Sequence, residues 1–257
     1  MNFTLPTPKL GDVTAITITT PDLELSLKYY QQLGFSEFQR ADFPFPWIQI
    51  TDGALLIMLR QDATPYIALT YYVKDMDVVV KELQQAGVPV TDMPTPNAIV
   101  RRYKIQSPDE TIISLVTFVD GFVQPPGPTM LTMSPQDYTN PDKYVNKVCG
   151  MFGEFAQPVK DLEASILFWE KLGFKALSKF SSPYPWAIIS DGLAVVGLHQ
   201  TSNFKDPTIT FFAKDMKEKI ENLKTAGLPG LEAATGLSNV TLTTPEGQRI
   251  NLFKLGM

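Results

Sequence analysis

The run DLELSLKYYQQLGF at residues 22–35 returns as DLEASILFWEKLGF at residues 161–174. The match continues without gaps through FPFPW and SPYPW, TDG and SDG, and LRQ and LHQ, at a constant offset of 139 residues. A weaker copy stands inside each half, where VKDMDVVVKELQQAGV and AKDMKEKIENLKTAGL carry the same pattern. Because an internal repeat constrains the whole fold, the sequence predicts four copies of one structural unit.

Each copy contains a segment with the signals of one capped helix. In all four an Asp stands twelve residues before a Gly: Asp22 and Gly34, Asp75 and Gly87, Asp161 and Gly173, Asp215 and Gly227. The Asp carboxylate can accept N–H groups left free at a helix N-terminus, and the Gly can adopt the left-handed conformation at the C-terminus. Between them apolar residues recur at i, i+4, i+7 and i+10, which predicts one buried face.

Strand-like runs surround each expected helix. The segments before the capping Asp residues, such as VTAITITT and TITFFA, are rich in β-branched and aromatic residues. Runs such as WIQIT, ALLIML, VTLTT and RINLFKL follow the helices. Asp52-Gly53 and Asp191-Gly192 predict hairpin turns. The expected unit is therefore β-α-β-β-β, and the short strand directly after each helix has the weakest signal.

Charge and composition exclude several classes of protein. The 257 residues carry 22 Lys and Arg against 27 Asp and Glu, so the net charge is −5 and a nucleic-acid partner is not expected. No segment approaches about 18 consecutive apolar residues, and no signal-peptide pattern opens the chain, so the expected location is the cytoplasm, with no membrane partner. The one cysteine, Cys149, is expected to be a small buried apolar residue.

Two consecutive units of this kind, each with an Asp-capped helix, resemble the vicinal oxygen chelate superfamily, also called the glyoxalase, bleomycin-resistance and dioxygenase fold. The resemblance implies an α+β protein in which four βαβββ units form two tandem glyoxalase-like domains with cupped mixed sheets. The expected domains are residues 10–120 and 146–257. Residues 121–145, with Pro125, Pro126, Pro128, Pro135 and Pro141, are expected to form an extended linker.

The resemblance also implies where metal ligands would stand: seven residues before the capping Asp, and just before a Leu in the last strand. In the first half these positions hold Ala15, Met58, Ala68 and Ser114, none of which suits a divalent metal that needs imidazole or carboxylate ligands. In the second half they hold Glu154, Gly197, Thr208 and Asn251. No metal is therefore expected in the first half, and no cofactor is expected for the chain, with a divalent metal in the second half as the alternative.

Glu154, His199 and Asn251 are the candidates for chemistry in the second half. His199, the one histidine of the chain, lies two residues beyond Gly197, and the two-residue strand period places it on the same face. Glu154 and His199 are therefore predicted to meet. A divalent metal on Glu154, His199 and the side-chain oxygen of Asn251 is one alternative; a histidine that serves only packing, and a glutamate paired with water, solvent or a ligand, are the others.

Further candidate ligand-binding residues follow from the same register. Arg60 stands where His199 stands in the other half, and either clamps a carboxylate or phosphate or extends to water. Trp47 and Trp186 begin equivalent strands and either wall a cavity or complete the core. Only one of the neighbours Arg101 and Arg102 can face a cavity, and alternation leaves that choice open. The remaining candidates are Ser114 in the first half and Thr208, Thr210 and Phe212 in the second.

Other catalytic chemistry finds no motif in this sequence. It contains no Gly-rich phosphate loop, no G-x-S-x-G elbow and no H-E-x-x-H pair. The leading hypothesis is a protein that binds a small, partly apolar molecule in a sheet-lined cavity without metal. The alternatives are a metal-dependent lyase, isomerase or dioxygenase that acts in the second half, with the first half degenerate, and a scaffold for interactions. The chain is expected to be a monomer with pseudo-dimeric domain packing, or a homodimer.

Overall fold

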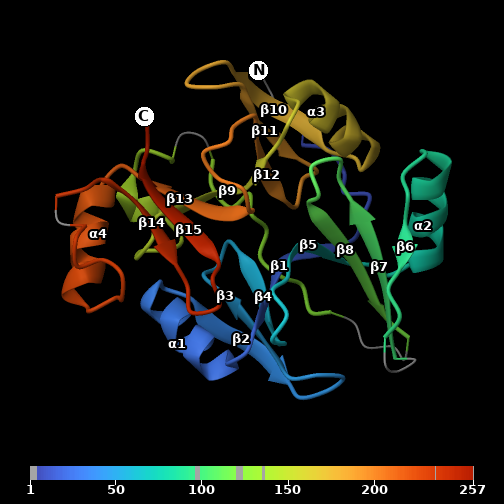
Figure 1. Cartoon of the computed structure of the whole chain (residues 1–257), viewed down its shortest axis with the longest axis horizontal. Coiled ribbons are helices and arrows are strands. Elements are labelled where there is room, and N and C mark those ends of the chain that lie inside the picture. Colours follow the sequence, from blue (N-terminus) through green and yellow to red (C-terminus); the bar gives the residue numbers. More distant parts are fainter. Residues whose placement is uncertain (1–4, 96–98, 120–123, 135–136, 235, 257) are drawn as a thin grey trace. The chain divides into compact units, whose positions relative to one another are not determined.

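The computed structural model describes residues 5–95, 99–119, 124–134, 137–234 and 236–256 (Figure 1). It contains four ten-residue helices: α1 (Leu23–Gln32), α2 (Met76–Gln85), α3 (Leu162–Lys171) and α4 (Met216–Thr225). The strands of the first half are β1 (Val13–Thr20), β2 (Ser36–Ala41), β3 (Trp47–Thr51), β4 (Leu56–Gln61), β5 (Ile67–Tyr72), β6 (Thr91–Asp92), β7 (Val100–Gln106) and β8 (Ile112–Phe118). Those of the second half are β9 (Met151–Pro158), β10 (Lys175–Phe180), β11 (Trp186–Ser190), β12 (Val195–His199), β13 (Thr208–Ala213), β14 (Asn239–Thr243) and β15 (Arg249–Lys254).

The predicted N-terminal caps are confirmed in position at all four helices. Asp22 accepts a hydrogen bond from the backbone N–H of Leu25 at 2.9 Å, and Asp161 accepts one from Ala164 at 3.0 Å. The predicted side-chain bond is wrong for Asp75 and Asp215, whose carboxylates make no capping bond. These two residues do not have the extended backbone that brings a capping carboxylate over the first turn.

The predicted C-terminal caps are confirmed at all four helices. Each glycine is left-handed, with φ from +71° at Gly87 to +95° at Gly173. The N–H of the residue after the glycine returns to a carbonyl five residues earlier, as Phe35 does to Tyr30 at 3.0 Å. This is the Schellman arrangement, and the apolar residue that closes it is buried in every copy.

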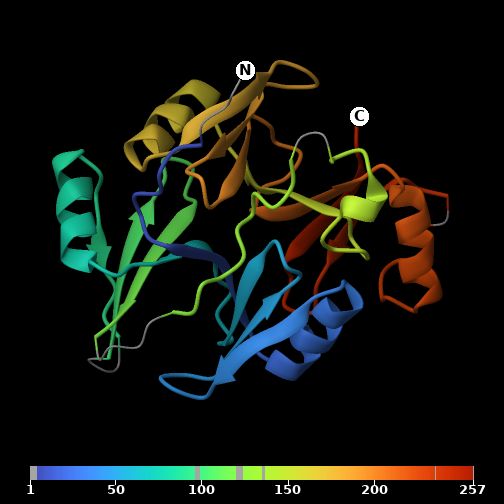
Figure 2. The ribbon, with the colours of Figure 1, turned by 180° about the vertical axis from the view of Figure 1, so that it is seen from behind.

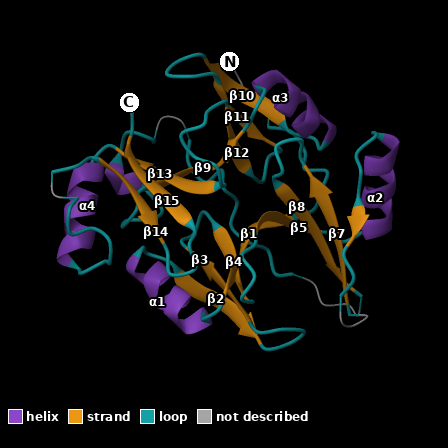
Figure 3. Cartoon of the chain, in the orientation of Figure 1, coloured by secondary structure: helices purple, strands orange, loops and turns teal. Residues whose placement is uncertain are grey.

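The strands form two mixed sheets. Their hydrogen-bonded orders are β2-β3-β4-β1-β5-β8-β7-β6 and β10-β11-β12-β9-β13-β15-β14. The parallel pairs β5/β8 and β13/β15 stand in equivalent places, as an internal repeat requires. Figure 3 shows the strands and helices in the expected α+β mixture.

Three of the four units have the predicted β-α-β-β-β order, and the fourth differs. β6, the strand directly after α2, has only two residues. The described residues between α4 and β14 contain no strand. That segment holds Pro229, which has no N–H to donate, and Gly230 and Gly236, which take left-handed turn conformations. The expectation of a short strand directly after the helix is therefore wrong for the fourth unit.

The chain forms two compact units, and each unit takes segments from both halves of the repeat. The first unit comprises Met1–Ile16, Ile67–Thr129 and Ala156–Pro207. The second comprises Thr17–Tyr66, Met130–Phe155 and Thr208–Met257. The first unit thus combines β5–β8 and α2 with α3 and β10–β12, and the second combines α1 and β2–β4 with α4 and β13–β15. The sequence-based domain boundaries remain a prediction.

In the first unit, buried polar contacts join the two sequence halves. The hydroxyl of Tyr71 donates to Oδ2 of Asp191 at 2.6 Å, and both residues are fully buried. Asp109, in the turn between β7 and β8, accepts hydrogen bonds from the Ser165 hydroxyl on α3 and from the Lys160 backbone. Figures 1 and 2 both show α2 alongside the β7–β8 ribbon of this unit.

The second unit repeats this arrangement with different residues. Glu246, in the turn between β14 and β15, accepts from the hydroxyls of Ser26 at 2.8 Å and Tyr30 at 2.9 Å, both on α1. Asp52 accepts from the side-chain amide of Asn146 at 3.0 Å. Helix α4 packs against β14 and β15 and buries Ile220 on them.

The predicted hairpin turns are confirmed, and the linker stays a prediction. Asp52 and Asp191 follow β3 and β11, and each accepts two backbone N–H groups of its own turn. In the predicted linker, Pro141 starts a single 3-10 turn, Pro141–Lys143, and Pro135 lies outside the described residues. No described helix is long and apolar enough to cross a membrane.

Candidate functional site

A cluster of hydroxyl and amide groups lies on one face of β13, β14 and β15, in the second unit. The side-chain amide of Asn251 donates to the hydroxyls of Thr208 at 3.1 Å and Thr210 at 3.3 Å. Its oxygen accepts from the hydroxyl of Thr241 at 2.8 Å. Asn251 stands directly beside Thr210 in the parallel pair and opposite Thr241 in the antiparallel pair. Thr208, Thr210 and Asn251 are buried, and we call these three residues with Thr241 the Asn251 cluster.

Strand alternation separates this cluster from the apolar core. Ile209, Phe211, Ile250 and Leu252 occupy the alternate positions and are fully buried on the other face. The cluster was predicted in part: Thr208, Thr210 and Asn251 were candidates, and Thr241 was not. The register of VTLTT against RINLFKL would have indicated Thr241, because directly opposed residues share a face.

Aromatic surface adjoins the Asn251 cluster. Phe212 and Phe253 pair in the next row of β13 and β15 and meet edge to face, with ring centroids 6.5 Å apart. Gly153 of β9 lies directly beneath the Phe212 ring, so a side chain at that position would collide with it. Glu154 follows Gly153 and is only 3% exposed. The second unit therefore holds a buried carboxylate, an amide–hydroxyl cluster and aromatic surface.

His199 lies at the end of β12 in the first unit, within an aromatic cluster. Its ring stacks on Trp186, with centroids 5.5 Å apart and an interplanar angle of 4°. Tyr184 and Phe204 meet its edges at 5.9 and 5.7 Å. Trp186 also stacks on Phe180, so this tryptophan contributes both to packing and to the half-exposed surface beside His199. Tyr184 occupies the place that Phe45 has in the repeated F-P-F-P-W motif. This match in the sequence could have identified Tyr184 as a member of the aromatic cluster.

Arg60 takes the equivalent place in the second unit. Its guanidinium lies 5.3 Å from the ring centroids of both Phe45 and Tyr66, and contacts Asp62 at 3.2 Å. Trp47 stands opposite Arg60 in the register and is almost fully buried. A nitrogen-bearing side chain flanked by aromatic rings is thus repeated at the same position of both halves.

The neighbours Arg101 and Arg102 lie on opposite faces of β7. Arg101 donates to the carboxylate of Asp77 on α2, at 2.6 and 3.3 Å, and therefore lies on the helix-covered face. Arg102 lies on the other face, in the row of Val116 and Tyr72. The structure thereby decides between two residues that alternation alone left open.

The remaining predicted positions fall as follows. Ala15, Ala68 and Ser114 are buried in the first unit, and Met58 is half-buried on β4 of the second. Gly197 is buried on β12 and carries no donor. Glu154 belongs to the second unit and His199 to the first, and a meeting of the two side chains stays a prediction.

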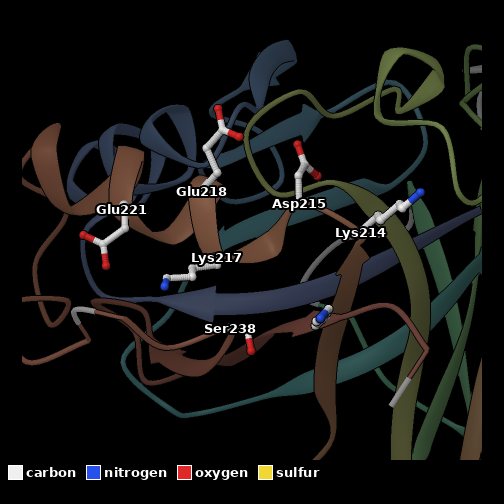
Figure 4. Close-up of a pocket in the computed structure, with 7 residues that line it drawn as sticks. Lys214, Asp215, Lys217, Glu218, Glu221 and Ser238 are labelled. Carbon is white, nitrogen blue, oxygen red and sulfur yellow. The ribbon is translucent and has the colours of Figure 1, made fainter.

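A charged hollow of about 550 Å³ lies at the start of α4 in the second unit (Figure 4). It is lined by Lys214, Asp215, Lys217, Glu218, Glu221, Ser238 and Lys254. Figure 4 shows the charged ends of the labelled side chains pointing in different directions. Three lysines are balanced by three acids that do not converge, so this hollow has no group arranged for chemistry. No motif in the sequence indicated it.

Burial sets the ionisation of two further groups in the second unit. Burial and the nearby Asp52 raise the pKa of the Cys149 thiol, which keeps it protonated and unreactive, as expected for a small apolar residue. Burial also raises the pKa of Asp52, although three hydrogen bonds from Leu55, Asn146 and Ala54 oppose this shift. Neither group lies in the Asn251 cluster.

No family model matches the sequence, and no curated protein matches it. Solved structures do match. Homoprotocatechuate 2,3-dioxygenase from Arthrobacter globiformis aligns over 99% of this chain and 84% of its own, with a TM-score of 0.60 and 15% identity. A variant of the Brevibacterium fuscum enzyme aligns over 98% of this chain and 73% of its own, with a TM-score of 0.59 and 14% identity. A catechol 2,3-dioxygenase aligns over 96% and 92%, with a TM-score of 0.56 and 12% identity.

The chain has the tandem vicinal oxygen chelate fold. The predicted resemblance and fold class are thereby confirmed, since the similarity extends over nearly all of both halves. Identities of 12–15% establish the fold alone, because a vicinal oxygen chelate fold can carry different chemistries. The chemistry of this chain therefore has to be argued from its own residues.

The residues at the metal positions of the vicinal oxygen chelate fold do not fit a metal in this chain. In the first half they offer two alanines, a methionine and a serine. In the second unit, Thr208 and Asn251 bind each other, and the Asn251 oxygen is engaged by Thr241. No three His, Cys, Asp or Glu side chains of the described part of the chain form a group that could hold a metal ion. One carboxylate and one imidazole do not make the ligand set that a catalytic metal needs.

Proposed function

We propose that this protein binds a small, partly apolar molecule through the second half of its vicinal oxygen chelate fold, without a metal. The observation that carries the proposal is the Asn251 cluster, in which amide and hydroxyl groups bind one another at positions where the fold would place ligands. Such groups form directional hydrogen bonds with a neutral or cationic organic molecule, and they are weak ligands for divalent metals.

The surroundings of the cluster support an organic ligand with an apolar body. Phe212 and Phe253 supply flat apolar surface beside Thr210 and Asn251. Glu154 supplies a buried carboxylate in the same unit, which favours a ligand with a hydroxyl or ammonium group. A few polar groups set among aromatic side chains are typical of small-molecule sites.

Metal content tests the metal-free part of this proposal. Elemental analysis of the purified chain is expected to find no stoichiometric metal. Titration with Mn²⁺, Ni²⁺, Zn²⁺ or Fe²⁺ is expected to leave the melting temperature unchanged, because only a ligand that binds the folded state stabilises it. Stoichiometric metal, or a stabilisation that Glu154→Gln abolishes and the exposed-residue control Glu163→Gln retains, would contradict it.

Ligand binding is tested by NMR with a set of small aromatic alcohols and amines. Binders are expected to shift backbone resonances of β13 and β15, and Thr210→Val is expected to weaken binding roughly tenfold, by removing one buried hydrogen bond. Thr225→Val, which changes an exposed residue of α4, is the matched control. Binders that shift these resonances equally in both variants, or a set without any binder, would count against the proposal.

A second candidate function is favoured by the solved structures, which include ring-cleaving dioxygenases over nearly the whole chain. In this case the second half would be a metal-dependent lyase, isomerase or dioxygenase, with Glu154 as ligand or base and His199 and Asn251 assisting. Oxygen uptake with homoprotocatechuate or catechol, after loading with Fe²⁺, separates the two. Uptake that is lost in Glu154→Gln would establish the enzyme and overturn the binding protein.

A further inference from the structure

The first half carries a different polar arrangement, on the face of β5, β8 and β7 that is turned away from α2. Ser114 of β8 occupies the position that Asn251 occupies in the second half. It is 1% exposed, and its hydroxyl has no hydrogen-bond partner among the described residues. A buried hydroxyl without a partner costs free energy, so it is retained where something else binds it.

Two cations share this face with Ser114. Lys104 stands directly opposite Ser114 in the β7/β8 pair, and Arg102 lies two residues along the same strand. Side chains of directly opposed residues start about 5 Å apart, so the Lys104 ammonium can reach the Ser114 hydroxyl. Both cations are half-buried, and neither has an ion-pair partner in the described part of the chain. Arg101, on the other face, is neutralised by Asp77.

Aromatic surface continues from the cations. Tyr72 and Phe118 stack with their rings almost parallel, at an interplanar angle of 5° and a centroid distance of 6.5 Å. Tyr72 belongs to the row of Val116 and Arg102, and Phe118 to the next row. Tyr72 is buried and supports the half-buried Phe118 ring, so the face offers cationic donors at one end and the Phe118 ring at the other.

We infer that this face of the first unit binds an aromatic carboxylate. The carboxylate would accept from the Ser114 hydroxyl and the Lys104 ammonium, with the Arg102 guanidinium beside it, and the ring would lie towards Tyr72 and Phe118. Arg and Lys bind carboxylates and phosphates alike, but the Tyr72–Phe118 pair beside them favours a ligand that also has an aromatic part. The residues of this site belong to the first unit, and those of the Asn251 cluster belong to the second.

Binding of benzoate, followed by NMR chemical-shift titration of the full chain, tests the inference. Benzoate is expected to shift resonances of β5, β7 and β8, and the neutral isostere benzamide is not. Lys104→Gln and Arg102→Gln are each expected to raise the dissociation constant roughly tenfold or more, as the loss of a charge-assisted hydrogen bond does. Arg101→Gln, one residue away on the opposite face, is the matched control and is expected to leave it within about twofold.

Ser114→Ala gives a readout that a purely structural role would not produce. It is expected to raise the melting temperature of the empty protein, since it removes an unpaired buried hydroxyl, and to weaken benzoate binding. Three outcomes would overturn the inference: no benzoate-induced shifts on β5, β7 or β8 in the wild-type chain; equal binding by the Arg101→Gln and Arg102→Gln variants; or displacement of benzoate by an equal concentration of inorganic phosphate. None of these outcomes depends on Glu154 or the Asn251 cluster.

Discussion

The Tyr71 hydroxyl and the Asp191 carboxylate form a fully buried hydrogen bond in the first unit. Burial and the charge of Asp191 raise the pKa of Tyr71 far above its usual range, so this hydroxyl stays a donor. In the second unit the place of Tyr71 is taken by Phe211, and Asp52 binds Asn146 instead. Each buried aspartate thus has a donor, but a different one.

Replacement of Tyr71 by Phe removes the donor and leaves a buried carboxylate oxygen unpaired. We expect Tyr71→Phe to lower the free energy of unfolding by about 1–3 kcal/mol, measured by urea denaturation. Tyr103→Phe is the control, because its half-exposed hydroxyl only accepts a 3.3 Å contact from Arg101. A Tyr71→Phe variant as stable as the control would show that the buried bond contributes little.

Asp52 makes stability depend on pH. Burial raises the pKa of the Asp52 carboxyl group above the unfolded value of about 3.9. At a pH between the unfolded and the folded pKa, the carboxyl group is therefore protonated in the folded chain and ionised in the unfolded chain. The protonated Asp52 therefore contributes its full share to the free energy of unfolding below the unfolded pKa. This contribution is lost as pH rises through the folded pKa. We expect the unfolding free energy of the wild type, minus that of Asp52→Asn, to fall as pH rises above about 4. A difference that grows with pH would have the wrong sign.

The helix C-terminal caps allow a matched comparison between elements. Gly87 after α2 and Gly34 after α1 are both left-handed, at φ +71° and +87°. A Cβ added to Gly87 would meet no atom within 4 Å, whereas one added to Gly34 would lie 2.8 Å from the Asn146 oxygen. We expect Gly87→Ala to cost about 1–2 kcal/mol from backbone conformation alone, and Gly34→Ala to cost more. Equal costs would mean that the region around Asn146 adjusts freely.

What the sequence predicts about the elements depends on how local the cause is. The helices were predictable because Asp and Gly act within one turn of the helix end. The missing strand after α4 was not, since the expectation was carried over from the other units although Pro229 and Gly230 oppose it. Arg101 and Arg102 show a similar limit: strand alternation says that they differ in face, and only the partner Asp77 on another element says which is which.

Some residues of the candidate site could be predicted from the sequence, but the contacts between them could not. The Thr208 and Asn251 positions followed from the resemblance to the vicinal oxygen chelate superfamily, which marks one residue in the first strand and one in the last strand of each unit. The hydrogen bonds between them, and the orphan hydroxyl of Ser114, depend on which strands pair and in which register. Periodicity in one segment carries no information about its distant partner.

At the scale of the whole molecule, the interleaved units make a prediction about fragments. Residues 1–129 and 130–257 are expected to fold poorly when separate, since contacts such as Tyr71–Asp191 and Tyr30–Glu246 join the two pieces. When mixed from denaturant, they are expected to recover the near-ultraviolet circular dichroism of the intact chain. Cooperative urea unfolding of either fragment alone would contradict this expectation and support two independent domains at the sequence boundary.

The same interleaving determines when this protein can fold during its synthesis. Residues 17–66 of the second unit leave the ribosome well before residues 208–257, which complete that unit. At about 5–20 residues per second the delay is roughly 7 to 30 seconds. During that time Phe35, which closes the C-terminal cap of α1, lacks its edge-to-face contact with Phe211. We therefore expect the nascent first half to expose apolar surface until residues 208–257 have been made.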